Sequence, residues 1–134
     1  MKKSDNKRTG DLGETIAAQY YSRKGFSIVG RNYLKNYGEI DIVARGTNGK
    51  HHFIEVKSVS YETKADLDSA VTHGTWRPEE KVDASKLRKI GLTVEAWLRE
   101  HPGVYQWQID VVTVRMVPRE RIARIKIIDN VIID

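Results

Sequence analysis

Three charged residues suited to metal-assisted chemistry lie near one another along the chain. Asp41 is followed by Glu55 after 13 intervening residues, and Lys57 lies two positions further on. Side chains on a strand alternate between its two faces, so Glu39 shares a face with Asp41, and Lys57 shares a face with Glu55. If an antiparallel hairpin sets Asp41 opposite Glu55, these four polar groups converge on one patch.

Two facing carboxylates repel each other across a sheet and need a compensating cation. Lys57 supplies one positive charge, and a divalent ion would supply more, with oxygen ligands of this kind suiting Mg²⁺ or Mn²⁺. A metal between two carboxylates beside an ammonium group is typical of phosphodiester hydrolysis. The metal polarises the phosphoryl oxygen and generates hydroxide, while the lysine orients water and stabilises negative charge. The plainer interpretation is a surface strand pair that carries a salt bridge.

Hydropathy and turn signals predict the elements that hold this hairpin. Strands are expected over 26–33, 39–44, 52–57 and 105–114, a first helix over 9–25, a second helix from Asp83 to the stop at 101–103, and one or two edge strands over 121–133. The hairpin's other face is expected to be apolar, formed by Ile40, Ile42, Ile54 and Val56. The order α-β-β-β-α-β-β predicts the α/β class, with a central mixed sheet flanked by helices.

The length of 134 residues predicts one domain spanning 1–134. Residues 1–8, with four cations against one acid, are expected to form a flexible basic tail, and 58–82 a long loop over the site that could close as a lid. The absence of cysteine excludes disulfides and thiol catalysis, and the net charge of +5 is compatible with a polyanionic partner. No apolar run is long enough to span a membrane, and no signal peptide is recognisable, which predicts a cytoplasmic protein.

The hairpin strings Gly38-Glu39-Ile40-Asp41-Ile42-Val43-Ala44 and Phe53-Ile54-Glu55-Val56-Lys57 resemble the core of PD-(D/E)XK nucleases. From about residue 10 to 114 the chain resembles the bacterial YraN-like family of small endonuclease-like proteins. Further matches are Gly10-Asp11-Leu12-Gly13-Glu14, Arg31-Asn32, Arg77-Pro78, Lys86 and Asp110-Val111-Val112. Two departures are Ile40 in place of the proline before the motif aspartate and a poor match after Met116.

The resemblance implies a restriction-endonuclease-like fold and assigns roles to the hairpin residues. Asp41 and Glu55 would be catalytic acids that bind the metal, the Val56 carbonyl a further ligand and Lys57 the catalytic lysine. Glu14 matches a first-helix glutamate that helps hold metal in related Holliday-junction resolvases.

For two of these acids, the sequence leaves a second interpretation open. Glu14 is equally compatible with a solvated position on its helix. Glu39 is expected to support the site, by binding metal directly or through water or by pairing with Lys57. Asp110, on the polar side of its strand, is expected to make a structural ion pair, with Arg31 as the candidate partner, and His52 is expected at the surface.

Several cations lie on or just before the predicted second helix. Arg77, Lys86 and Lys89 are compatible with a solvated face or with a rim that contacts nucleic-acid phosphates without reading bases. Lys86 is the preferred contact because it borders the apolar stripe of the helix.

These observations together predict a metal-dependent endonuclease that acts on DNA, with branched or single-stranded DNA as candidate substrates. One alternative is a nucleic-acid-binding protein that keeps the nuclease fold with little turnover. Another is a protein-interaction scaffold, or a homodimer, built on the β-rich C-terminal edge.

Overall fold

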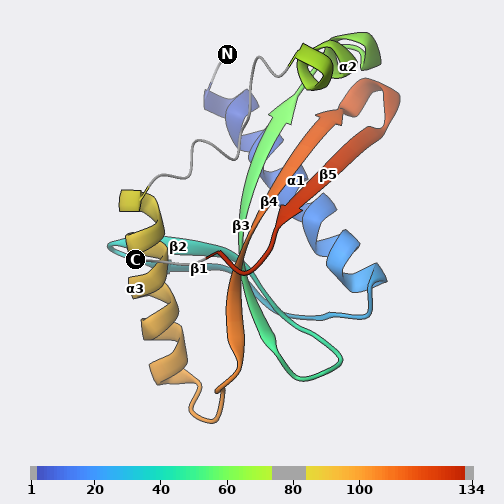
Figure 1. Cartoon of the computed structure of the whole chain (residues 1–134). Coiled ribbons are helices and arrows are strands. Elements are labelled where there is room, and N and C mark those ends of the chain that lie inside the picture. The colour runs from blue at the N-terminus through green and yellow to red at the C-terminus, as the bar shows by residue number, and fades with distance from the viewer. Residues whose placement is uncertain (1–2, 74–83, 132–134) are drawn as a thin grey trace.

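The computed structural model describes residues 3–73 and 84–131, with side chains described from residue 7 onward. In chain order the elements are α1 (Lys3–Arg23), β1 (Ser27–Lys35), β2 (Gly38–Arg45), β3 (His51–Ser60), α2 (Lys64–His73), α3 (Ala84–Glu100), β4 (Trp107–Val117), the 3-10 helix η2 (Pro118–Glu120) and β5 (Ile122–Ile128) (Figure 1). No helix within the described ranges is long and apolar enough to cross a membrane.

The strands form one sheet in the order β1-β2-β3-β4-β5. β3 and β4 run parallel, with His51 beside Trp107 and Ser60 beside Met116, whereas the other neighbouring pairs are antiparallel. Parallel neighbours need a crossover connection, and α2 and α3 lie within the connection between β3 and β4. The predicted α/β architecture, a mixed sheet flanked by helices, is therefore confirmed.

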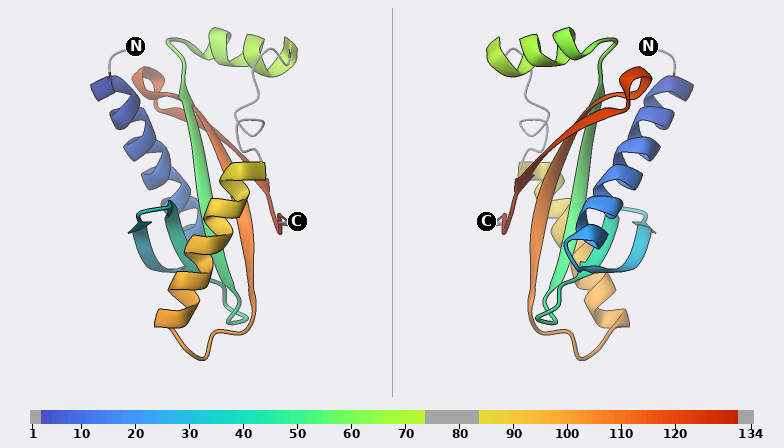
Figure 2. Two further views of the ribbon diagram at one scale, coloured as in Figure 1. Left: turned by 90° about the vertical axis from the view of Figure 1, so that its left-hand side faces the viewer. Right: turned by 90° about the vertical axis from the view of Figure 1, so that its right-hand side faces the viewer.

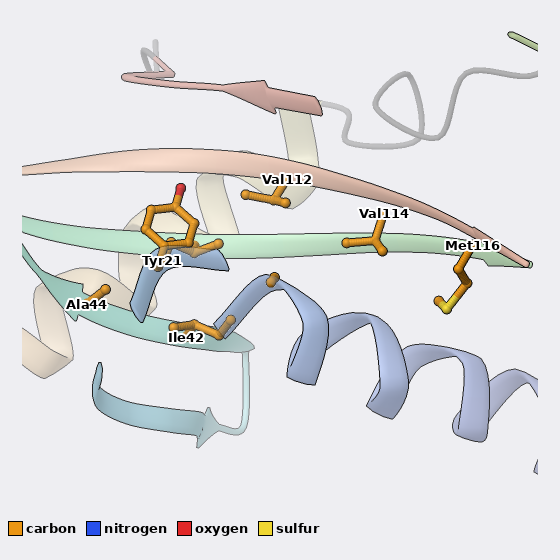
Figure 3. Close-up of a cluster of buried hydrophobic side chains, with 8 residues drawn as sticks. Tyr21, Ile42, Ala44, Val112, Val114 and Met116 are labelled. Atoms are coloured by element: carbon orange, nitrogen blue, oxygen red, sulfur yellow. The ribbon is translucent and has the colours of Figure 1, made fainter. Parts of the chain in front are cut away.

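Helices α1 and α3 cover opposite faces of the sheet (Figure 2), and each face has its own apolar cluster. The α1 cluster consists of Ala17, Tyr21, Ile42, Ala44, Ile54, Val112, Val114 and Met116 (Figure 3). The α3 cluster consists of Ile40, Val43, Phe53, Ile90, Val94, Trp97 and Ile109. The central strands contribute to both clusters, so they are fixed from both sides.

Helix α1 begins earlier than the apolar pattern predicts. It starts at Lys3 rather than at Thr9, so the expected flexible tail is helical over residues 3–8. The apolar pattern starts late because residues 3–8 are all polar or charged. Lys7 and Asp11 form an ion pair at 3.4 Å across one of these turns, an arrangement that stabilises exposed helix.

The prediction of a long loop over 58–82 is also wrong for the residues that the structure describes. β3 continues to Ser60, and α2 occupies Lys64–His73, while 74–83 lie outside the described residues. Thr63 Oγ accepts a hydrogen bond from the Asp66 backbone N–H at 3.1 Å, and Leu67 is fully buried. A threonine followed three positions later by an acid is a known helix-start signal, so the sequence did contain the information that predicts α2.

Close approach between α1 and β3 depends on a glycine. A Cβ added at Gly13 would overlap Ser58 Oγ and lie 2.7 Å from Ser58 Cβ. The helix backbone therefore lies directly against β3, which places Glu14, the next residue, toward the β2–β3 hairpin.

Two alanine substitutions in α1 test this packing. Gly13→Ala is expected to destabilise the fold by about 1–3 kcal/mol, because α1 must move away from β3. The matched control is Gly10→Ala in the same helix, where nothing lies within 4 Å of an added Cβ, and where alanine is expected to stabilise by about 0.5–1 kcal/mol. Urea unfolding of both variants measures the difference, and equal midpoints would contradict the proposed close approach.

Candidate metal-binding site

The register of the β2–β3 hairpin is the one that the sequence predicts. Ile42 lies opposite Ile54, and the ladder continues to Arg45 opposite His51. One step beyond Ile42, this register sets Asp41 opposite Glu55, but the strands part at that point. The Val56 N–H donates a hydrogen bond to Asp41 Oδ2 at 2.7 Å. The carboxylate of Asp41 thus occupies the gap where the backbone ladder ends.

The apolar backing of the site differs from the prediction. Ile42 and Ile54 belong to the α1 cluster, with Val56 packed against it, whereas Ile40 belongs to the α3 cluster with Val43. Ile40 and Ile42 therefore do not share a face. Strict alternation fails because β2 bends away from β3 beyond Ile42, and a twisted strand end can turn a side chain to the other layer.

The acids and two lysines line one pocket of about 220 Å³ between the hairpin and α3. Its lining residues are Gly38, Glu39, Asp41, Glu55, Val56, Lys86, Lys89 and Ile90. Asp41 and Glu55 are both buried. Gly38 allows α3 to come close, because a Cβ there would lie 2.5 Å from Thr93 Oγ and 3.0 Å from the Lys89 carbonyl oxygen. Lys86 and Lys89 therefore lie at the pocket, while Arg77 falls outside the described residues.

Two ammonium groups share one oxygen of Glu55. Lys57 Nζ lies 3.2 Å and Lys86 Nζ 2.8 Å from Glu55 Oε1. Partial burial, together with the hydrogen bond to Lys86, lowers the pKa of Lys57. Lys57 thus pairs with Glu55. The sequence had left open a pairing of Glu39 with Lys57, and the structure shows the pair with Glu55 instead.

Burial and neighbouring negative charges strongly perturb the pKa of Asp41. Burial, and after it the negative charge of Glu55, raise the pKa of Asp41 to about 8, whereas the hydrogen bond from the Val56 N–H lowers it. Glu14 and Glu39 add further repulsion. The acids predicted from the sequence therefore act on one another in the folded protein.

Asn32, which the sequence analysis matched to the family without giving it a role, joins the two supporting acids. With its amide nitrogen turned toward the carboxylates, Asn32 donates to Glu14 Oε1 at 2.8 Å and to Glu39 Oε1 at 3.1 Å. Its backbone has φ of 54° within β1, a left-handed conformation in which asparagine is over-represented among non-glycine residues. Nothing local in the sequence signals such a contact, because it depends on α1, β1 and β2 meeting.

Glu14 is not the fully solvated glutamate of the alternative interpretation. Burial, and then the neighbouring Glu39, raise its pKa, whereas Arg31 lowers it. Arg31 Nη2 lies 3.9 Å from Glu14 Oε1. The expected pairing of Arg31 with Asp110 is therefore wrong, since Arg31 is engaged at the site instead.

Asp110 anchors a separate buried network on the α1 face. Its carboxylate accepts hydrogen bonds from Tyr21 Oη at 2.9 Å, Gln108 Nε2 at 2.7 Å and the Asn130 backbone N–H at 3.1 Å. His52 Nδ1 lies 2.7 Å from the same carboxylate, with only 13% of the histidine side chain exposed. The expected surface position of His52 is therefore wrong. These contacts tie α1, β3, β4 and the segment after β5 together, which is a structural role.

The donor set of the pocket suits a small divalent cation. Mg²⁺ commonly binds through one or two carboxylates and keeps several water ligands, and Asp41 and Glu55 supply two carboxylates whose mutual repulsion a cation would relieve. Within the described part of the chain, no three or more His, Asp or Glu side chains surround a common ion position. An ion bound in this pocket would thus be held by the carboxylates of Asp41 and Glu55 and by water.

Comparison with known proteins identifies the family. A model of an uncharacterised protein family, UPF0102, matches residues 13–114. The chain belongs to the UPF0102 family. A UPF0102 protein of Campylobacter lari is 34% identical over 105 residues, which cover 78% of this chain and 81% of the relative. One of Caldanaerobacter subterraneus is 34% identical over 121 residues, covering 90% and 89%. One of Corynebacterium diphtheriae is 36% identical over 105 residues, covering 78% and 75%.

The UPF0102 match confirms the YraN-like membership that the hairpin strings predicted. The matched range includes both strings and four of the acids at the site, namely Glu14, Glu39, Asp41 and Glu55. The family description names no activity, so the chemistry is argued from the geometry of the pocket.

The raised pKa of Asp41 makes the stability of this UPF0102 protein depend on pH. The folded state holds the Asp41 proton up to about pH 8, whereas the ordinary value is 3.8. The folded state therefore binds more protons between these values, and the free energy of unfolding falls as pH rises through this window. Asp41→Asn keeps an oxygen acceptor for the Val56 N–H and removes the charge. We expect this variant to melt several degrees above wild type at pH 8 and to lose most of the difference near pH 4.

Thermal unfolding in chelator across pH 4–9 measures this effect. Glu62→Gln is the matched control, because Glu62 is an exposed acid outside the pocket, and its melting profile should follow that of wild type. Parallel profiles for wild type and Asp41→Asn would show that Asp41 carries no such strain.

Proposed function

We propose that this protein is a metal-dependent nuclease with a restriction-endonuclease-like fold, in which the β2–β3 hairpin supplies the PD-(D/E)XK motif. The reaction is hydrolysis of a phosphodiester bond. A water oxygen forms a bond to phosphorus, the bond from phosphorus to the leaving oxygen breaks, and the leaving oxygen takes up a proton. DNA is the proposed substrate.

The observation that carries this proposal is the meeting of Asp41 and Glu55 at one pocket, with Lys57 paired to Glu55. Both carboxylates are buried, Glu55 raises the pKa of Asp41, and the ammonium group of Lys57 lies 3.2 Å from Glu55. A salt bridge serving stability alone would not require a second carboxylate beside the first, since like charges destabilise each other. Acids with perturbed pKa values that lie together at a pocket are typical of functional sites.

The proposed metal ligands are Asp41, Glu55 and the carbonyl oxygen of Val56. Bound Mg²⁺ or Mn²⁺ would polarise the phosphoryl oxygen and lower the pKa of a bound water. Lys57 is held beside Glu55, where its ammonium group can orient the attacking water and stabilise the negative charge that develops on phosphorus-bound oxygen.

The supporting acids act through neighbouring groups in this proposal. Glu14 and Glu39 share the Asn32 amide, which fixes their carboxylates beside the pocket. Each adds negative potential at Asp41, and this increases the attraction of the pocket for a cation. On the rim, Lys86 and Lys89 line the same pocket and are proposed to contact backbone phosphates, which position nucleic acid without selecting a base sequence.

Three substitutions that keep side-chain size test the assignment. Asp41→Asn, Glu55→Gln and Lys57→Met are each expected to reduce cleavage at least a hundredfold in Mg²⁺ or Mn²⁺. The reason is that each removes a charge required in the reaction but little volume. The assay uses a panel of junction, flap, single-stranded and duplex DNA, because the pocket does not select among them.

Two controls separate chemistry from folding. Lys50→Met removes a lysine from the turn between β2 and β3, away from the pocket lining, and should cleave like wild type. Circular dichroism should show native spectra for all four variants. Full activity in the Lys57→Met protein would contradict the role of that lysine. Salt-sensitive DNA binding with no product from wild type would instead favour the non-catalytic nucleic-acid-binding protein.

A further inference from the structure

Lys86 reaches the site from a different element than Lys57. It lies in the first turn of α3, whereas Glu55 and Lys57 both lie on β3. Its ammonium group is nonetheless the nearer of the two to Glu55, at 2.8 Å against 3.2 Å. One carboxyl oxygen of Glu55 therefore receives two cations, and the side chain that carries it is only 7% exposed.

The two lysines differ in how easily they could leave Glu55. The side chain of Lys57 is 20% exposed and that of Lys86 is 40% exposed. A lysine has a long flexible stem and a strongly hydrated ammonium group. Lys86 can therefore move its charge into solvent at lower cost than Lys57, which is confined beside Glu55 on the same strand.

Lys86 also occupies the region that a metal ion would need. It lines the pocket together with Asp41 and Glu55, and its charge interacts with both carboxylates. A divalent cation held by these two acids would lie close to an ammonium group of the same sign, and that repulsion falls when the ammonium group moves away. Cation binding and the Lys86–Glu55 pair thus oppose each other.

We propose that Lys86 is an exchangeable counter-ion of the metal site. It neutralises Glu55 when no divalent ion is bound, and it leaves Glu55 when Mg²⁺ or Mn²⁺ binds. Lys86 thereby weakens metal binding. In the metal-free protein it stabilises the buried carboxylate of Glu55 by pairing with it. This inference rests on the proposed function, because it requires that Asp41 and Glu55 bind a cation. It makes Lys86 a positioning residue, whereas Lys57 remains the catalytic lysine.

Titration calorimetry of the full chain with Mn²⁺ tests the competition. Lys86→Met keeps the length and apolar stem of the side chain and removes its charge. We expect this variant to bind Mn²⁺ about three- to tenfold more tightly than wild type, the change that removal of one competing ion pair gives. Lys86→Gln, also uncharged, should shift in the same direction. Arg88→Met is the matched control, because Arg88 is an exposed cation of the same helix that does not line the pocket. This variant should bind Mn²⁺ within twofold of wild type.

Thermal unfolding in chelator gives a readout independent of metal affinity. Lys86→Met should melt below wild type without metal, because Glu55 loses its nearer counter-ion, and saturating Mn²⁺ should narrow the difference. A permanent structural salt bridge predicts another pattern, in which the variant is destabilised equally with and without Mn²⁺ and binds the ion no more tightly.

The outcomes distinguish this inference from the proposed function. If wild type binds Mn²⁺ and Lys86→Met binds it equally or more weakly, the counter-ion role is overturned and the metal site stands. If neither wild type nor the Lys86 variants bind Mn²⁺, both the metal site and the counter-ion role are overturned. Tighter binding in both uncharged Lys86 variants, with Arg88→Met unchanged, supports the proposal.

Discussion

Repulsion between Asp41 and Glu55 is the interaction on which the rest of the site depends. Two carboxylates buried at one pocket repel each other, and the raised pKa of Asp41 shows that the folded protein does not fully relieve this repulsion. Each neighbouring group reduces part of the cost. The Val56 N–H donates to Asp41, and Lys57 and Lys86 both contact Glu55. An arrangement that costs stability in this way is typical of sites selected for function rather than for folding.

The sheet topology explains why these groups meet. β2 leaves β3 just beyond Ile42, and the resulting gap admits the Asp41 carboxylate beside the backbone of β3. β3 itself is held on its other edge by parallel pairing with β4. The crossover that this pairing requires contains α3, which brings Lys86 and Lys89 to the pocket. Glycines at 13 and 38 let α1 and α3 approach the sheet closely enough to complete the arrangement.

The structure separates two groups of buried polar residues that look similar in the sequence. Asp110 is more buried than Asp41, yet its carboxylate is surrounded by Tyr21, Gln108 and the Asn130 N–H, with His52 at 2.7 Å. A carboxylate supplied with this many donors is stabilised in place. Asp41 instead faces another acid and accepts a backbone hydrogen bond from the Val56 N–H. This contrast favours the hairpin, and not the Asp110 network, as the place where a cation is needed.

The sequence alone determined the strands, the hairpin register and the acids that face one another, because alternation with period two and a short turn fix which side chains share a face. It did not determine the start of α1, because residues 3–8 carry no apolar pattern, although the cap at Thr63 did signal α2. Only the tertiary structure decided that Ile40 turns to the α3 layer, that Asn32 joins Glu14 to Glu39, and that Lys86 contacts Glu55. Each of these depends on elements distant in sequence meeting in space, and local spacing contains no information about such contacts.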